Sequence, residues 1–231
     1  MTLDHPLDRA VWNGLTSRLA GFATSDSGPR AVRIDPEVGV FLSGADAEPE
    51  TLAVMADLAR RHPGAGMVEK ADGPMAGIDL AGVEVVSRVP LVQMVASALT
   101  PGGPDIAFET LTETDAPEML ALATLTRPGP FRSATRRLGP FIGVKQGGRL
   151  VAMAGRRLRV DGFTELSGVC THPDWRGRGY AAGLSRVVAG EILATGEGVF
   201  LHAFAEHHAT IAFYRSLGFE VRAEMTYTIL K

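Results

Sequence analysis

The sequence predicts an α/β protein built from two parts, a smaller N-terminal α/β lobe over residues 1–104 and a larger domain over residues 105–231. Three observations support this prediction. Helix-like and strand-like patterns alternate along both parts. The segment "TPGGP" (Thr100 to Pro104) separates the two parts, because two prolines around two glycines disfavour both helix and strand. Glycine-containing turns at 146–148 and 161–162 join strand-like stretches in the second part, which is typical of hairpins.

The N-terminal lobe shows two helix-like and two strand-like patterns. In order, we expect a helix over 7–21, a short buried strand over 38–44, a helix over 49–64 and a strand over 82–97. The first helix places Val11, Trp12, Leu15 and Leu19 on one face. Pro90 is expected to interrupt the last strand, because proline lacks the N–H that a strand within a sheet donates. No residue pattern with recognisable chemistry occurs in this lobe.

The second part has a denser pattern of elements. The helix that follows its first strand has Pro117 near its start and an acidic first turn, and Gly218 stops the last helix. In order, we expect a strand over 105–112, a helix over 115–126, a basic loop with a short helix over 127–139, three strands within 140–171, a helix over 179–196, a strand over 198–206, a helix over 208–218 and terminal strand material over 219–231.

Composition narrows the class of protein. The chain has 23 basic and 26 acidic residues and a net charge of −3, so no bulk basic field attracts nucleic acid. Cys170 is the single cysteine, which excludes internal disulfides and thiolate zinc clusters. His207 and His208 have no third ligand at a suitable spacing, so we expect no metal. No apolar run approaches ~20 residues and no signal pattern opens the chain, so we expect no membrane partner and a cytoplasmic monomer or homodimer.

The stretch "RGRGYA" (Arg176 to Ala181) follows a strand-like stretch and opens a helix. Glycine lets a backbone approach a ligand closely, arginine favours an anion, and a helix N-terminus offers free N–H groups. A P-loop is excluded, because no Lys followed by Ser or Thr comes after the second glycine. A dinucleotide fingerprint matches formally in Gly177, Gly179 and Ala182, but too few residues follow Glu206 to complete that fold. A tight turn with solvated arginines remains the alternative.

Two neighbouring stretches extend this pattern, "TELSGVCT" (Thr164 to Thr171) before the turn and "HHATIAFYRSLGF" (His207 to Phe219) after it. Strand, R-x-x-G-x-A turn, helix, strand and Y-x-x-x-G-F helix together resemble the GNAT acetyltransferase superfamily over residues 105–231. The combination is also similar to the glycine-acyltransferase-like branch of that superfamily. The resemblance implies a mixed, mostly antiparallel central sheet flanked by helices, preceded by a smaller α/β lobe that we expect to be a degenerate half of the same fold.

The resemblance implies acetyl-CoA as co-substrate and no metal. Backbone N–H groups of the turn would hold the pyrophosphate with the help of the helix N-terminus. The strand at 169–171 would pair with the pantetheine amides, and the N–H near Val169 would polarise the thioester carbonyl. The family often has an Asn that contacts the cofactor at the position where this chain has His207, and the imidazole of His207 can also donate a hydrogen bond. The cofactor-binding residues that we expect are Val169, Cys170, Thr171, Arg176, Gly177, Arg178, Gly179, Tyr180, Ala181 and His207.

Acyl transfer needs an acid for the departing thiolate and a base for the incoming ammonium. Tyr214 occupies the family's general-acid position. The alternative role for Tyr214 is that of an aromatic residue of the core. Glu165 is the expected base, because strand alternation places it on the same face as Val169. A structural partner for an arginine is the alternative for Glu165. His202, on the neighbouring strand, ranks below Glu165 as a base.

The function that we predict is transfer of an acetyl or longer acyl group from acyl-CoA to a primary amine of a small molecule or peptide, by direct attack. The alternative is a non-catalytic acyl-CoA-binding sensor or interaction module that keeps the turn. No residue pattern names the acceptor amine. The basic loop before the three strands holds arginines that could meet an acceptor carboxylate, the cofactor phosphates or solvent: Arg127, Arg132, Arg136 and Arg137.

Overall fold

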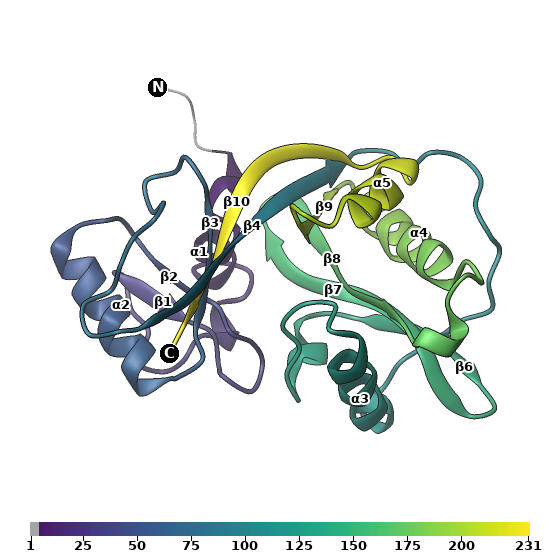
Figure 1. Cartoon of the computed structure of the whole chain (residues 1–231), viewed down its shortest axis with the longest axis horizontal. Coiled ribbons are helices and arrows are strands. Elements are labelled where there is room, and N and C mark those ends of the chain that lie inside the picture. The colour runs from purple at the N-terminus through teal and green to yellow at the C-terminus, as the bar shows by residue number, and fades with distance from the viewer. Residues whose placement is uncertain (1–4) are drawn as a thin grey trace.

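The computed structural model describes residues 5–231, so the first four residues of the predicted N-terminal lobe lie outside the described part. The chain forms a large sheet in the order β3-β10-β4-β9-β8-β7-β6-β5 and a small β1-β2 sheet (Figure 1). The strands are β1 Ala31–Arg33, β2 Leu42–Gly44, β3 Gly66–Lys70, β4 Val85–Ala96, β5 Glu109–Thr110, β6 Phe141–Gln146, β7 Arg149–Val160, β8 Phe163–Thr171, β9 Gly198–Phe204 and β10 Glu220–Leu230.

Helices cover both faces of the large sheet (Figure 1). Ile142 and Val144 of β6 pack with α4 and α5 on one face, whereas Phe141 packs with α3 on the other. This split follows from strand alternation, which points successive side chains to opposite faces. The α-helices are α1 Ala10–Leu15, α2 Pro49–Arg61, α3 Ala116–Thr126, α4 Tyr180–Leu193 and α5 His208–Ser216, and short 3-10 turns cover Pro6–Arg9, Ala20–Phe22, Glu113–Asp115, Thr135–Leu138 and Pro173–Trp175.

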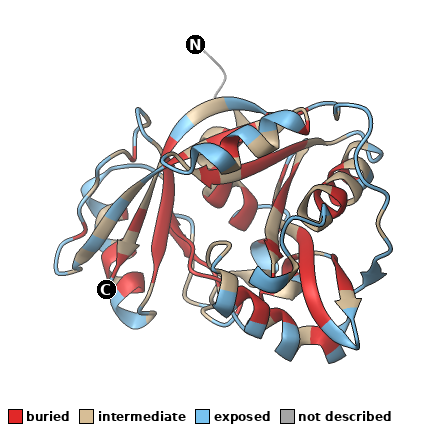
Figure 2. Cartoon of the chain, turned by 45° about the vertical axis from the view of Figure 1, so that its right-hand side comes forward, coloured by how far each residue is buried: buried red, intermediate tan, exposed pale blue. Residues whose placement is uncertain are grey.

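The large sheet is mixed and mostly antiparallel, which confirms the predicted fold class. Among its neighbouring strands, only β8 and β9 are parallel. The hairpins predicted at 146–148 and 161–162 join β6 to β7 and β7 to β8, with Gly147, Gly148 and Gly162 at positive φ. Buried residues concentrate along these strands and on the helix faces toward them (Figure 2).

Strand β4 carries the sheet across the predicted boundary at residue 104. It comes from the first part of the chain, yet it pairs with β9 on one side and with β10 on the other. Together β4 and β10 run between the end that holds α2 and the end that holds α4 and α5 (Figure 1). The two parts therefore share one sheet, and whether either part folds alone stays a prediction.

Pro90 does not interrupt β4, contrary to the expectation from the sequence. The Pro90 carbonyl accepts a hydrogen bond from the Ala205 N–H, just beyond the end of β9. Because N–H and C=O of one strand residue point to the same side, the missing N–H of Pro90 also faces this end. Register pairing with β9 begins only at Leu91, so the proline costs no ladder hydrogen bond.

The predicted strand over 105–112 is shorter than expected, because only Glu109 and Thr110 pair with β6. The preceding residues cross helix α4 instead. The Ile106 side chain lies over Gly183, where a Cβ would come within 2.6 Å of it. A little earlier, the Arg186 side chain donates a hydrogen bond to the Thr100 carbonyl. The segment after β4 is thus fixed along α4.

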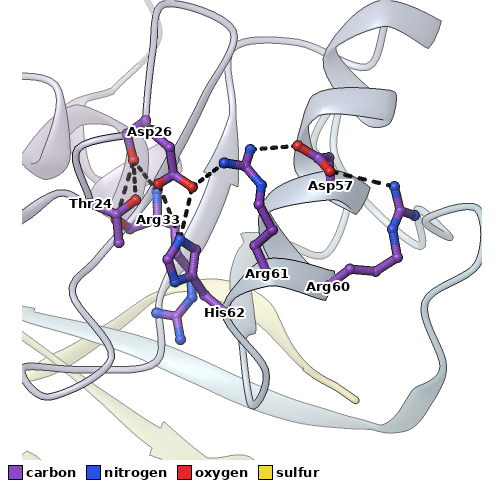
Figure 3. Close-up of polar contacts among 8 residues, drawn as sticks. Thr24, Asp26, Arg33, Asp57, Arg60, Arg61 and His62 are labelled. Carbon is purple, nitrogen blue, oxygen red and sulfur yellow. Dashed lines mark hydrogen bonds and ion pairs between the residues drawn. The ribbon is translucent and has the colours of Figure 1, made fainter.

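A polar cluster holds the end of α2 against the segment before β1 (Figure 3). Asp26 contacts Nε2 of His62 at 2.9 Å and also pairs with Arg61, which bridges to Asp57. The hydrogen bond from Thr24 lowers the pKa of Asp26 to about 2, against a smaller raising effect of burial and with added help from His62 and Arg61. The cluster therefore has a structural role in the N-terminal lobe.

Candidate active site

Strands β8 and β9 separate halfway along their length. They pair in parallel over only three residues of each strand, up to Glu165 opposite Phe200. Beyond that point β8 continues to Thr171 and β9 to Phe204 without register partners in each other. The separation opens the sheet between Val169 and the following strand. Backbone groups of β8 are therefore free to meet a ligand.

The predicted phosphate turn lies between β8 and α4. Gly177 has φ 76° and Gly179 has φ 78°, values that glycine adopts without the strain of a side chain. Gly179 is the residue before α4, and its carbonyl accepts the N–H of Gly183. The N–H groups of residues 180–182 thus have no partner within the helix and, with the helix dipole, form an anion site. The Arg178 guanidinium lies 4.4 Å from the centre of the Trp175 ring.

A cavity of about 490 Å³, here called the turn cavity, opens beside this turn. Of the ten residues predicted to bind the cofactor, nine line it, and His207 does not. His207 directly precedes α5 and has an exposed side chain. It lines a second cavity, which is described below. The nine lining residues are Val169, Cys170, Thr171, Arg176, Gly177, Arg178, Gly179, Tyr180 and Ala181.

One orphaned polar atom tests whether a coenzyme A molecule fits the turn cavity. Oγ1 of Thr171 is buried and has no hydrogen-bond partner among residues 5–231. Such a hydroxyl costs free energy unless a ligand satisfies it. The amides of a pantetheine arm that runs along β8 would supply the partner, and the turn N–H groups would take the pyrophosphate. The residues present therefore fit coenzyme A.

A second cavity of about 390 Å³, the inner cavity, adjoins the first. Val169 and Tyr214 belong to the walls of both cavities. Phe41 and Val68 of the N-terminal lobe, together with Tyr227 of β10, form part of the far wall. The two cavities meet at the place where the thioester carbonyl is expected.

Tyr214 projects from α5 toward this junction. Its ring packs edge-on against Phe213 at 5.0 Å and Phe219 at 5.7 Å between centroids. Burial, with a smaller effect of Cys170, raises the pKa of Tyr214 well above its usual range. The phenol therefore keeps its proton throughout the working pH range. Tyr214 is thus a packed aromatic residue that lines both cavities, and its role as the acid stays a prediction.

Glu165 lies at the base of the inner cavity and is fully buried. Its two oxygens each contact Arg157 at 2.8 Å, and they also accept the Leu158 N–H at 3.2 Å and Nδ1 of His202 at 2.9 Å. Burial alone would raise the pKa of Glu165, but Arg157, and then His202, lower it to about 2. A carboxylate with these partners is a weak base, so the geometry favours the arginine-partner alternative.

His202 connects Glu165 to a buried polar chain. Its Nδ1 faces Glu165, and its Nε2 lies 3.2 Å from Nε2 of Gln93. The Gln93 Oε1 accepts from Arg222 at 2.8 Å, so the Gln93 amide nitrogen is the donor to His202. Both ring nitrogens of His202 are thereby engaged. The contact from Nδ1 thus helps to hold the Glu165 carboxylate in place.

Comparison with known proteins places these features in a family. A family model described as FR47-like protein matches residues 141–228. A crystal structure from Novosphingobium aromaticivorans, named as an acetyltransferase from the GNAT family, shares 41% identity, covers 98% of each chain and has a TM-score of 0.87. The chain belongs to the GNAT family.

More distant GNAT structures share the fold alone. A GCN5-related N-acetyltransferase from Kribbella flavida has 18% identity, a TM-score of 0.63 and coverage of 96% of this chain and 95% of that one. One from Sphaerobacter thermophilus has 14% identity, a TM-score of 0.53 and coverage of 97% and 91%. No curated protein matches the sequence. The GNAT assignment is thus confirmed, while the glycine-acyltransferase-like branch stays a prediction.

GNAT acetyltransferases use acetyl-CoA as co-substrate, and the fold suggests acyl transfer from it. Within residues 5–231, no helix is long and apolar enough to cross a membrane, and no group of three or more His, Cys, Asp or Glu gathers as metal ligands. Sequence reasoning missed the far wall of the inner cavity. Its residues come from distant strands with no shared motif, and the one local signal was the arginine-rich end of β7, where Arg156, Arg157 and Arg159 follow an apolar run.

Proposed function

We propose that this GNAT protein transfers an acetyl group from acetyl-CoA to a primary amine of a small molecule or peptide. The observation that carries the proposal is the meeting of the two cavities at Val169 and Tyr214. The turn cavity is bordered by backbone N–H groups that suit a phosphate. The inner cavity is a separate space that could hold an acceptor. A protein that only bound acyl-CoA would not need the second cavity to open at the reacting carbon.

Each residue of the site would have a role that follows from its position. The turn N–H groups and the α4 N-terminus would hold the pyrophosphate. The Val169 N–H would polarise the thioester carbonyl, which makes it more open to direct attack by the amine. The Tyr214 hydroxyl would give its proton to the departing thiolate, and the resulting phenolate would take a proton from the nitrogen that has attacked. The acceptor would enter the inner cavity and reach the carbonyl as a free amine.

Release of free thiol from acetyl-CoA tests this proposal. The purified protein is mixed with acetyl-CoA and a panel of amines, and thiol is followed with a chromogenic reagent. Amine-dependent thiol release, with the acetylated amine identified by mass spectrometry, is the expected result. Tight acetyl-CoA binding without amine-dependent release would instead support the binding-module alternative.

A further inference from the structure

The inner cavity carries more positive than negative charge. Among the described residues, its walls include Arg127, Arg157 and Arg176 but one carboxylate, Glu165. Both oxygens of that carboxylate already accept hydrogen bonds. The cavity thus has no free carboxylate to bind a second cation, and its excess charge favours an anionic group on the ligand.

Arg157 is the cation best placed to bind such a group. Glu165 takes the guanidinium edge formed by Nε and Nη2, which leaves the edge formed by Nη1 and the second Nη2 proton. Phe41 packs under the guanidinium, with its ring centre 5.0 Å away. The side chain is only 12% exposed, and it borders the cavity. An arginine held on one edge and from below is a prepared binding site for a carboxylate.

Tyr227 of β10, whose side chain carries a hydroxyl, lines the same cavity. Burial raises the pKa of Tyr227, and the charges of Arg157, Arg132 and Arg33 oppose that rise. Three guanidinium groups therefore act on the space around this hydroxyl. Their charge offsets the repulsion that Glu165 would exert on a second carboxylate nearby.

The distance between this wall and the reacting carbonyl sets the length of the ligand. Glu165, the partner of Arg157, lies four residues before Val169 on β8, a separation of at most about 13 Å, because Gly168 between them has φ 65° and departs from the extended conformation. An α-amino acid places its amine and its carboxylate too close together to reach both points. The walls between include Leu91, Leu201 and Phe204, which suit an apolar chain.

We propose that the acceptor is an ω-amino carboxylate, whose carboxylate binds Arg157 and Tyr227 while its amine reaches Val169 and Tyr214. The inference rests on the proposed function and names the substrate class of the same site. Glu165 then acts as a positioning residue, since it fixes the guanidinium edge that faces the cavity. The middle of the acceptor is an apolar chain of several methylene groups.

The binding test uses protein saturated with coenzyme A, so that the turn cavity is filled, and two probes of equal length, octanoate and octanamide. Binding is followed by ligand-detected NMR. We expect octanoate to bind about tenfold more tightly than octanamide. This preference should fall to within threefold in Arg157→Lys and also decrease in Tyr227→Phe, which keeps the ring and is expected to fold. Arg88→Gln, which removes a guanidinium that pairs with Asp79 away from the cavity, is the matched control. Equal affinity for both probes in the unmodified protein would overturn the inference.

A transfer test separates this inference from the proposed function. Thiol release is compared for 8-aminooctanoate, 8-aminooctanamide and 2-aminooctanoate. Faster release with 8-aminooctanoate than with the other two supports the inference. Equal or faster release with the amide refutes the inference and leaves the transferase proposal standing. If no amine gives release while octanoate is still preferred in the binding test, the transferase proposal fails and the anionic site remains.

Discussion

Arg157 and Glu165 face each other on neighbouring strands and meet through two parallel contacts, each 2.8 Å long. The pair is buried, so each charge depends on the other. Glu165 was predicted from the sequence as the general base. The structure instead places its carboxylate in a bidentate ion pair at the base of the inner cavity.

Glu165→Gln tests the base role directly. Because the pKa of Glu165 is lowered to about 2, the carboxylate is already ionised across pH 6 to 9. We expect the variant to lose activity through displacement of Arg157, and to lose about 3–5 kcal/mol of stability through the unpaired guanidinium. The pH–rate profile should keep its shape. A profile in which the acidic limb disappears in the variant would restore Glu165 as the base, and His202→Ala would then be tested in the same way.

Tyr214→Phe keeps the ring and its packing against Phe213 and Phe219 but removes the proton donor. We expect turnover to fall about 10²-fold, at the low end for acid–base catalysis. Affinity for acetyl-CoA, measured by calorimetry, should stay within about twofold, because the ring still closes the turn cavity. Turnover within twofold of the unmodified protein would rule out Tyr214 as the acid.

Glu69 predicts how stability depends on pH. Its carboxyl is buried and contacts Oγ of Ser43 at 2.8 Å, and burial raises its pKa to about 7 despite Ser43 and Arg9. A raised pKa in the folded state gives stability that is present below the unfolded value and is lost as pH rises through 7. We therefore compare the free energies of unfolding of Glu69→Gln and the unmodified protein by urea unfolding. As pH rises from 5 to 8.5, we expect this free energy to shift in favour of Glu69→Gln by on the order of 2 kcal/mol. If Glu69→Gln and the unmodified protein differed in stability by the same amount at pH 5 and at pH 8.5, this account would be contradicted.

Removal of residues 1–104 tests how far the two parts depend on each other. The truncated chain loses β3 and β4, the two neighbours of β10, so β10 is left without a partner strand and β9 with an unpaired edge. The inner cavity also loses the wall formed by Phe41 and Val68. We expect the truncated chain to be poorly soluble or unfolded by circular dichroism. A soluble and fully active chain that begins at Asp105 would show that the first part has no supporting role.

The turn at 176–181 was predictable from the sequence because its chemistry is local. Two glycines, the arginines and the helix start occupy consecutive positions, and the structure places the predicted residues on one cavity. The inner cavity was not predictable in this way. Arg157 and Tyr227 are separated by many residues and come together only because β4 joins the sheet between β9 and β10. Pairing between distant strands leaves no local signal, which is also why Pro90 was misread as a break.

The central claim is that one acetyl-CoA binds at the turn between β8 and α4, and calorimetry of a glycine variant tests it most directly. Gly177 is preferable to Gly179, since a Cβ on Gly177 meets no atom within 4 Å, whereas one on Gly179 would lie 3.0 Å from Pro104. Gly177→Glu would place a carboxylate against the pyrophosphate. Gly147→Glu, at a hairpin glycine that also has positive φ and open space, is the matched control. The account predicts one site per chain in the unmodified protein and the control, and an affinity at least tenfold weaker in Gly177→Glu without unfolding. Two sites per chain, or equal affinity in both variants, would contradict it.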